Sequence, residues 1–271
     1  MTARADKDKA ARYRAPLREL LDRVLAVGRA PDGMLYDVVD LAGGKVIDAR
    51  IIDTWGYIYN AHLTYDLATG ENRYRRQIVE ALEVLPKKYM DHRWGGSDDY
   101  ADSIESAIVL DNRLHVDGVE QWIARTVPRM WAMQEPDGTV NRRYDDGSFG
   151  RTSVLVAWRC SQGVRAEPWR DDLRLGAAAG DGDLYVVLGA DRAWSGRLVF
   201  DRARSREVLH LPLNYPRINE LPEYYAVSRS ADYRVAVEGG APQTVSGAVL
   251  IEGLPVKLDA GRVSRIVVRR Q

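Results

Sequence analysis

The sequence predicts an α+β chain with two domains, a helical-hairpin array followed by an antiparallel β-sandwich. Apolar residues recur at helical spacing through the first part of the chain, and short β-branched segments replace them after about residue 170. The length of 271 residues also exceeds the ~100 to 150 residues of a typical single domain. We therefore expect a helical domain over residues 1–170 and a β-sandwich domain over residues 171–271.

Six helices are expected in the first part. The first has apolar residues at helical spacing from Leu17 to Leu25 and is followed by Gly28 as a stop. The second, fourth and sixth are richer in small and polar residues, which is typical of inner helices surrounded by amphipathic outer ones. The six cover approximately residues 14–27, 53–66, 74–85, 99–112, 119–134 and 149–162.

An internal repeat supports this organisation. A helix that ends at a Pro-Asp-Gly turn and leads through a polar stretch to an inner helix is found at residues 31–33 and again at residues 136–138, 105 residues later. This offset equals two units of roughly fifty residues, a plausible length for a helical hairpin. Chance similarity around a common turn is the alternative explanation.

Short strands are expected in the second part, separated by Gly, Asp and Pro. The candidates are residues 184–188, 196–200, 207–211, 233–237 and 264–268. The Gly-Asp-Gly-Asp segment at 180–183 is interpreted as a turn. It lacks the Gly-Lys-Ser/Thr ending of a phosphate loop and precedes a strand instead of a helix.

Composition limits the partners. Lys and Arg together number 39, as do Asp and Glu, so the formal charge is zero and neither nucleic acid nor an anionic membrane is expected as the main partner. No apolar run approaches the ~20 residues that span a bilayer, and the charged start lacks the apolar core of a signal peptide. A single cysteine, Cys160, excludes an internal disulfide. We expect a cytoplasmic protein with a neutral ligand.

Neither a metal nor a cofactor is expected. The histidines, His62, His92, His115 and His210, have no metal-binding spacing. A calcium site that uses Asp98, Asp99 and Asp102 is an unspecific alternative.

The densest group of candidate catalytic residues lies in the fourth helix. Asp102 and Glu105 are three residues apart and share one helix face, close in sequence to Trp94 and Tyr100. They would form an acid/base pair beside aromatic rings that stack on sugar, those of Trp55, Trp94 or Tyr100. Because carboxyl groups on adjacent turns lie close together, Asp53 or Asp145 from another loop is a better second group. Alternatively, the carboxylates cap a helix and bond neighbouring helices.

Polar aromatic residues are unusually frequent in the second helix. Trp55, Tyr59 and His62 share one stripe, and Asp53, Tyr57 and Asn60 share another. Tyr59, His62 and Asn60 would supply the proton donor, the base and the polarising amide for β-elimination of a uronic acid polymer. Alternatively, this is a buried inner helix whose polar groups bond its neighbours.

A third polar loop, residues 144–152, leads to the sixth helix. We expect Asp145 and Arg151 to contact substrate there, although Arg151 would equally pair with Asp102 or Glu105. Because the repeat places each inner helix after a polar stretch, the starts at Asp53, Tyr100 and Phe149 should lie on one side of the helical array.

Several motifs resemble a known enzyme class. Asp-Thr-Trp-Gly-Tyr at 53–57, Trp-Gly-Gly at 94–96, Tyr-Ala-Asp-Ser-Ile-Glu at 100–105 and the two Pro-Asp-Gly turns look like the inner-helix starts of (α/α)-toroid carbohydrate-active enzymes. The ending at 253–261 resembles the last strands of the β-sandwich that follows the toroid in heparinase II/III-like lyases and in several glycosidases. The resemblance implies an enzyme that cleaves glycosidic bonds of an oligo- or polysaccharide by hydrolysis or by β-elimination.

The helical part departs from this pattern in one respect. About three hairpins precede the β-rich part, which is fewer than a closed toroid contains. The chain therefore resembles the C-terminal half of such an enzyme, and a homo-oligomer or a second subunit is expected to complete the ring. A non-catalytic carbohydrate-binding or assembly module, in which the same carboxylates are structural, is the alternative function.

Overall fold

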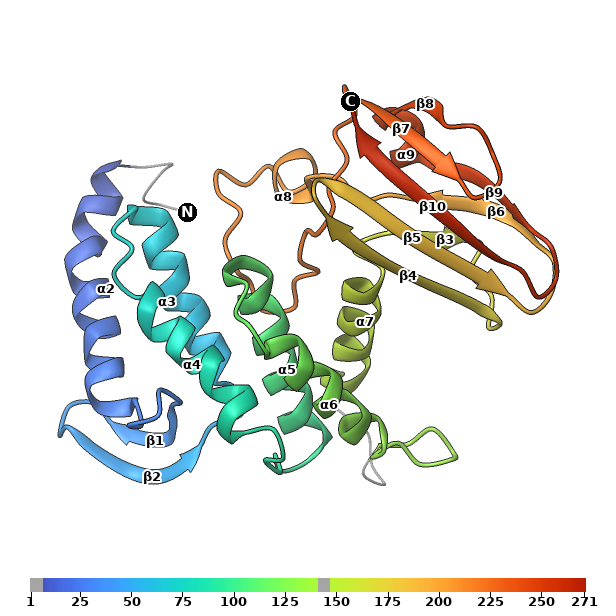
Figure 1. The fold of residues 1–271 in the computed structure, drawn as a ribbon. Helices are drawn as coiled ribbons and strands as arrows, with labels where there is room; N and C mark the ends of the chain where they lie inside the picture. Colours follow the sequence, from blue (N-terminus) through green and yellow to red (C-terminus); the bar gives the residue numbers. More distant parts are fainter. Residues whose placement is uncertain (1–6, 141–146) are drawn as a thin grey trace. The chain divides into compact units, whose positions relative to one another are not determined.

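The computed structural model of the chain describes residues 7–140 and 147–271 (Figure 1). It contains two compact units, one formed by Met1–Ser153 and Leu211–Glu220, the other by Val154–His210 and Leu221–Gln271. The chain therefore passes between the units three times. Helices and antiparallel sheets are both present, which confirms the α+β class. The boundary expected at residue 170 stays a prediction.

Each of the six predicted helices is present in the structure. Two of them also have the expected inner or outer character. In the inner helix, every residue from Tyr100 to Asp111 is buried. The outer helix that follows Tyr74 buries one face, formed by Ile78, Ala81, Leu82 and Leu85. The helices are α2 (Lys7–Gly28), α3 (Trp55–Thr69), α4 (Arg75–Lys88), α5 (Ser97–Leu114), α6 (Val119–Trp131) and α7 (Ser148–Cys160).

Helices α3 and α5 approach each other closely at Gly56. A Cβ added at Gly56 would overlap the side chain and the Cα of Ser106, so this contact requires a glycine. One turn away, Trp55 Nε1 donates a hydrogen bond to Ser103 Oγ at 2.9 Å. The small residues of these two inner helices therefore allow close packing.

A β-hairpin that the sequence analysis missed lies between α2 and α3. Strands β1 (Tyr36–Asp40) and β2 (Lys45–Ile51) pair antiparallel. Ile47, in β2, is 65% exposed. Because most of the hairpin residues are not buried, their alternation of apolar and polar residues is weak, and the segment was interpreted only as a polar excursion.

The two Pro-Asp-Gly turns have the same hydrogen bonds. In the first, Ala30 N donates to Met34 O at 2.8 Å and Gly33 N donates to Ala30 O at 2.9 Å. In the second, the equivalent bonds at Glu135 N and Gly138 N measure 2.8 and 2.9 Å. Both glycines have positive φ, 99° and 86°. The agreement extends the internal repeat from sequence to backbone geometry.

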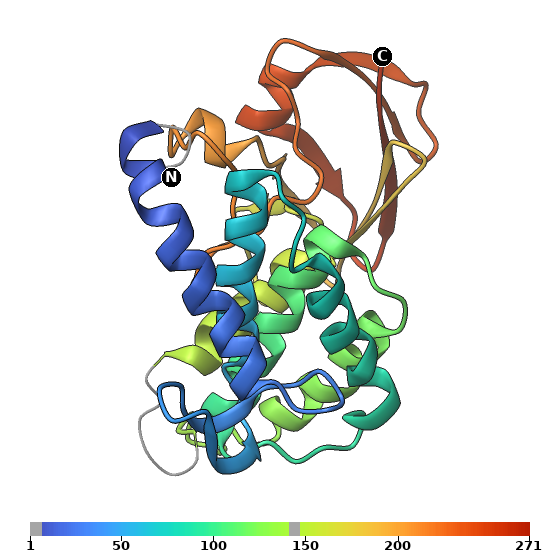
Figure 2. The same ribbon diagram turned by 90° about the vertical axis from the view of Figure 1, so that its left-hand side faces the viewer.

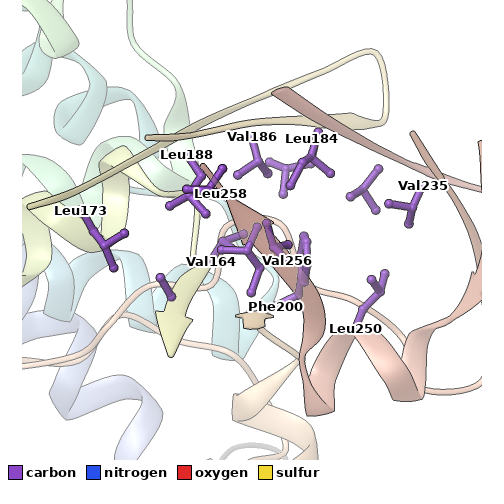
Figure 3. Packing of buried hydrophobic residues seen from close by; sticks show 14 of the residues in the cluster. Val164, Leu173, Leu184, Val186, Leu188, Phe200, Val235, Leu250, Val256 and Leu258 are labelled. Atoms are coloured by element: carbon purple, nitrogen blue, oxygen red, sulfur yellow. The ribbon is translucent and has the colours of Figure 1, made fainter. Parts of the chain in front are cut away.

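The second unit contains two antiparallel sheets with one hydrophobic core. The strand orders are β4-β5-β10-β7-β8 and β3-β6-β9. Figure 3 shows Leu184, Val186 and Leu188 of the first sheet facing Val256 of the second and Leu250. The strands are β3 (Arg165–Glu167), β4 (Leu173–Gly180), β5 (Asp183–Ala190), β6 (Trp194–Val199), β7 (Asp232–Val237), β8 (Gln243–Ser246), β9 (Leu254–Leu258) and β10 (Val263–Arg270), with helices α8 (Arg204–Glu207) and α9 (Gly247–Glu252).

Four of the five predicted strands are present, and one prediction was wrong. Residues 207–211 do not form a strand, because α8 ends in this segment and Val208 N donates to Arg204 O, and His210 has a φ of 49°. The predicted turn at 180–183 is confirmed: it joins β4 to β5, and Asp181 and Gly182 have φ values of 53° and 81°, as a two-residue hairpin turn requires.

Within residues 7–140 and 147–271, no helix is long and apolar enough to cross a membrane.

Candidate functional site

The starts of the three inner helices come together in the first unit, as expected. Asp53, immediately before α3, interacts with Asp99 in the first turn of α5. Arg151, in the first turns of α7, contacts Asp102 of α5. Asp53 before α3 and the first turns of α5 and α7 therefore supply side chains to one region.

Four side chains form a hydrogen-bonded group, here called the carboxylate network: Tyr57, Asp102, Glu105 and Arg151. Tyr57 Oη donates to Asp102 Oδ1 at 2.7 Å and lies 3.1 Å from Glu105 Oε2. Arg151 Nη2 lies 3.2 Å from Asp102 Oδ1 and 2.5 Å from Glu105 Oε2. Both carboxylates therefore contact the same guanidinium nitrogen, so the arginine bridges them.

Glu105 is buried and its two oxygens are both engaged. Its side chain is 1% exposed. Oε1 accepts a hydrogen bond from Asn219 N at 2.9 Å, and Oε2 accepts one from Arg151 Nε at 2.8 Å. A buried carboxylate requires such partners, because an unpaired one would carry a large desolvation cost. The arrangement is typical of a structural anchor.

The surroundings of Asp102 change its ionisation. Burial raises the pKa of Asp102, with the charge of Asp98 acting in the same direction, although the Tyr57 hydroxyl and Arg151 oppose the shift. Burial also raises the pKa of Asp53 to about 6, assisted by its interaction with Asp99. These two carboxyl groups hold protons at a higher pH than a solvated aspartate, as a general acid requires.

Tyr59 and His62, the candidates for β-elimination, lie in the core. Tyr59 Oη donates to Gly33 O at 2.5 Å, and burial raises its pKa to about 12. His62 is fully buried, with Nδ1 2.8 Å from Ile58 O and Nε2 3.1 Å from Leu21 O. Both side chains bond backbone carbonyls instead of facing an open surface.

The structure also places the expected sugar-stacking rings in the core. Trp55, Trp94 and Tyr100 are 0%, 5% and 4% exposed. Trp94 stacks on Tyr89 at a ring-centroid distance of 6.3 Å. These rings fill space between helices, because large aromatic side chains contribute most when buried. They offer no accessible face for a ligand.

A cavity of about 780 Å³ lies between α2 and α3, which run side by side in Figure 2. We call it the α2–α3 groove. Sequence reasoning missed it, although Tyr13, Leu17 and Leu20 follow one another at helical spacing and remain exposed. Its walls are Ala10, Ala11, Tyr13, Arg14 and Leu17 of α2, Tyr57, Asn60, Ala61, Thr64, Tyr65, Ala68 and Thr69 of α3, and Tyr215, Pro216 and Ile218.

The groove is apolar and carries no net charge. Arg14, its charged wall residue, forms an ion pair with Glu71 at 2.6 Å. Asn60 is 5% exposed, and its Oδ1 has no hydrogen-bond partner among the residues that the structure describes. Rotation of the amide about its last side-chain bond can turn either its donor or its acceptor to the groove. The groove wall thus contains a buried amide oxygen without a partner.

Tyr57 connects the groove to the carboxylate network, because it belongs to both.

Asp145 lies outside the described residues. No group of three or more possible metal ligands is found in the described part of the chain, the candidate calcium ligands Asp98, Asp99 and Asp102 included.

Comparison of the chain with models of known protein families gave no match, and comparison with curated proteins gave none either.

Proposed function

We propose that this chain binds a neutral oligosaccharide in the α2–α3 groove. Sugar rings combine apolar C–H faces with hydroxyl groups, and tyrosines with a few hydrogen-bonding side chains match that combination. The groove has four tyrosines, the unpartnered Asn60 and two threonines, and its arginine is already paired. The balance of charge across the chain supports a neutral ligand as well.

Tyr57 links the groove to the carboxylate network. Tyr57 presents one part to the groove and donates its hydroxyl to Asp102, so a ligand in the groove lies next to a residue of the carboxylate network. A sugar that contacts Tyr57 would therefore affect the hydrogen bond from Tyr57 to Asp102. We regard non-catalytic binding as the function that this geometry supports best.

Binding is tested with a pair of matched tyrosines. Tyr13, in the groove wall, is 54% exposed, and Tyr185, in β5, is 45% exposed. A glycan panel identifies ligands of the parent chain, and calorimetry compares the variants. We expect Tyr13→Ala to weaken binding about fivefold, because it removes an aromatic stacking contact of about 1 kcal/mol, and Tyr185→Ala to have no effect. A panel without any bound glycan would overturn the proposal.

Hydrolysis of a glycosidic bond is a second candidate, favoured by the raised pKa of Asp102. Asp102 would be the general acid, and Asp53, which is also raised, would be a second carboxylate from another loop. Elimination through Tyr59 and His62 receives no support from their burial.

Replacing Asp102 by Asn tests hydrolysis, because the change removes the acid and keeps the shape. Loss of oligosaccharide turnover with an unchanged melting temperature would support catalysis. A large loss of stability, with no turnover in the parent chain, would favour the binding module.

We also propose that the helical unit is part of an (α/α) toroid and the β-rich unit a β-sandwich. The meeting of three inner-helix starts, the repeated turns and the core shared by two sheets support this proposal. Completion of the ring by a second subunit would cover the exposed Leu20, which lies outside the groove.

A further inference from the structure

One wall of the groove comes from a distant part of the sequence. Residues 211–220, here called the strap, belong to the first unit, whereas the residues on both sides of them in sequence belong to the second. The strap contains neither helix nor strand. It therefore lacks a backbone ladder to hold its shape, and side chains of the helical unit must fix it.

Two anchors hold the C-terminal end of the strap. Asn219 N donates to Glu105 Oε1 at 2.9 Å, across 114 residues of sequence. Glu220 forms an ion pair with Arg113 of α5 at 2.7 Å, and their side chains are 1% and 13% exposed. Glu220 also lies 3.2 Å from Arg217, within the strap. The buried Glu220 carboxylate accepts no hydrogen bond from the described residues, so the charges of Arg113 and Arg217 hold it, and a displaced partner would leave a buried charge uncompensated.

The strap residues just before these anchors line the groove. Tyr215, Pro216 and Ile218 form its third wall. Ile218 is 58% exposed, so an apolar side chain stands at the groove with most of its surface uncovered. It lies next in sequence to Asn219, whose backbone is fixed by Glu105. The anchors therefore set the position of the apolar wall.

We propose that the strap is the specificity-determining wall of the α2–α3 groove and that Glu105 and Glu220 are its positioning residues. The strap selects a ligand that presents an apolar face to Tyr215 and Ile218 while it hydrogen bonds to Asn60. This inference rests on the proposed binding of a ligand in the groove. It gives the buried Glu105 a role through the backbone of Asn219 and not through contact with substrate.

The wall is tested with Nile red, a neutral apolar dye whose fluorescence rises in apolar sites, on the full chain. Ile218→Asp is compared with Ile47→Asp, because Ile47 is similarly exposed, at 65% against 58%, and lies in β2 outside the groove. Aspartate at this position removes apolar contact with the dye, and its charge would lose water when the dye binds. Ile218→Asp should therefore lower the affinity for Nile red at least ~10-fold. Ile47→Asp should leave it unchanged. Failure of the parent chain to bind the dye, or equal binding by both variants, overturns the proposal.

The anchors are tested with Glu220→Gln, which keeps the side-chain shape and removes the charge that faces Arg113. Hydrogen exchange should rise over residues 211–220, and the affinity for Nile red should fall, while the amides of α4 and α6 stay protected. A loss of protection throughout the unit, or unchanged exchange in the strap, would exclude the positioning role. Arg217→Gln removes the other ion pair of Glu220, and the same measurements apply to it. Because the Arg217 side chain is 22% exposed, this variant is less harmful to folding.

The two proposals fail in different ways. If oligosaccharides do not bind but Ile218→Asp weakens dye binding, the strap is the wall and the sugar assignment is wrong. If an oligosaccharide binds the parent chain and the Ile218→Asp variant equally well, the groove takes sugar and the strap does not select it.

Discussion

Two residues of the same chemical type, one turn apart on α5, have different roles because of what surrounds them. Asp102 and Glu105 share a helix face, and their pairing on that face is predictable from sequence. Glu105 accepts a backbone hydrogen bond from Asn219, whereas burial raises the pKa of Asp102. No local pattern could indicate a partner 114 residues away. The ambiguity between acid/base pair and structural anchor was therefore inherent in the sequence.

Asp53 predicts how stability depends on pH. Burial raises its pKa to about 6 in the folded chain, against ~3.9 when unfolded, so the folded state binds more protons between these values. Stability from this group is therefore present at low pH and is lost as pH rises through about 6. We expect Asp53→Asn to stabilise the chain at pH 7 by about 1 kcal/mol, a figure reduced for partial exposure, and to have no effect at pH 4.

Chemical denaturation at the two pH values measures this difference. Asp117→Asn, at an exposed aspartate, serves as the control for the loss of one negative charge. An equal change in unfolding free energy at pH 4 and pH 7 would contradict the assignment.

At the scale of elements, helices were more predictable than strands. All six helices were found from their apolar spacing, since that pattern arises from burial of one face. The first hairpin escapes prediction because it is largely exposed, and residues 207–211 have the alternation of a strand although a short helix ends there. Alternation of apolar residues indicates a strand only where one face is buried, and sequence does not show where that is.

The contact between α3 and α5 predicts an unequal response to the same substitution. Gly56→Ala places a methyl group against Ser106 and should destabilise the chain by about 3 kcal/mol. Gly150→Ala, in α7, meets no atom within 4 Å and should be neutral or stabilising by up to about 1 kcal/mol. Thermal melts of the two variants compare them directly. Similar melting temperatures would show that α3 and α5 do not pack as described.

At the scale of the whole molecule, the order of helical and β-rich parts was predictable, and the path of the chain was not. Composition changes once along the sequence, near residue 170, whereas the chain crosses between the units three times. The strap has no periodicity that marks it as part of the helical unit. The groove was unpredictable for the same reason, because Ile218 acquires its role only through the anchors at Asn219 and Glu220.

The distance between Glu105 and Asn219 in sequence also has a consequence for synthesis. A ribosome adds ~5 to 20 residues per second, so several seconds or more separate the appearance of the two partners, which are 114 residues apart. During this interval the nascent helices carry Glu105 without the backbone amide of Asn219 and Arg113 without the carboxylate of Glu220. The helical unit therefore reaches its final form only after much of the β-rich unit has been translated, and a contact of such long range is expected to form late.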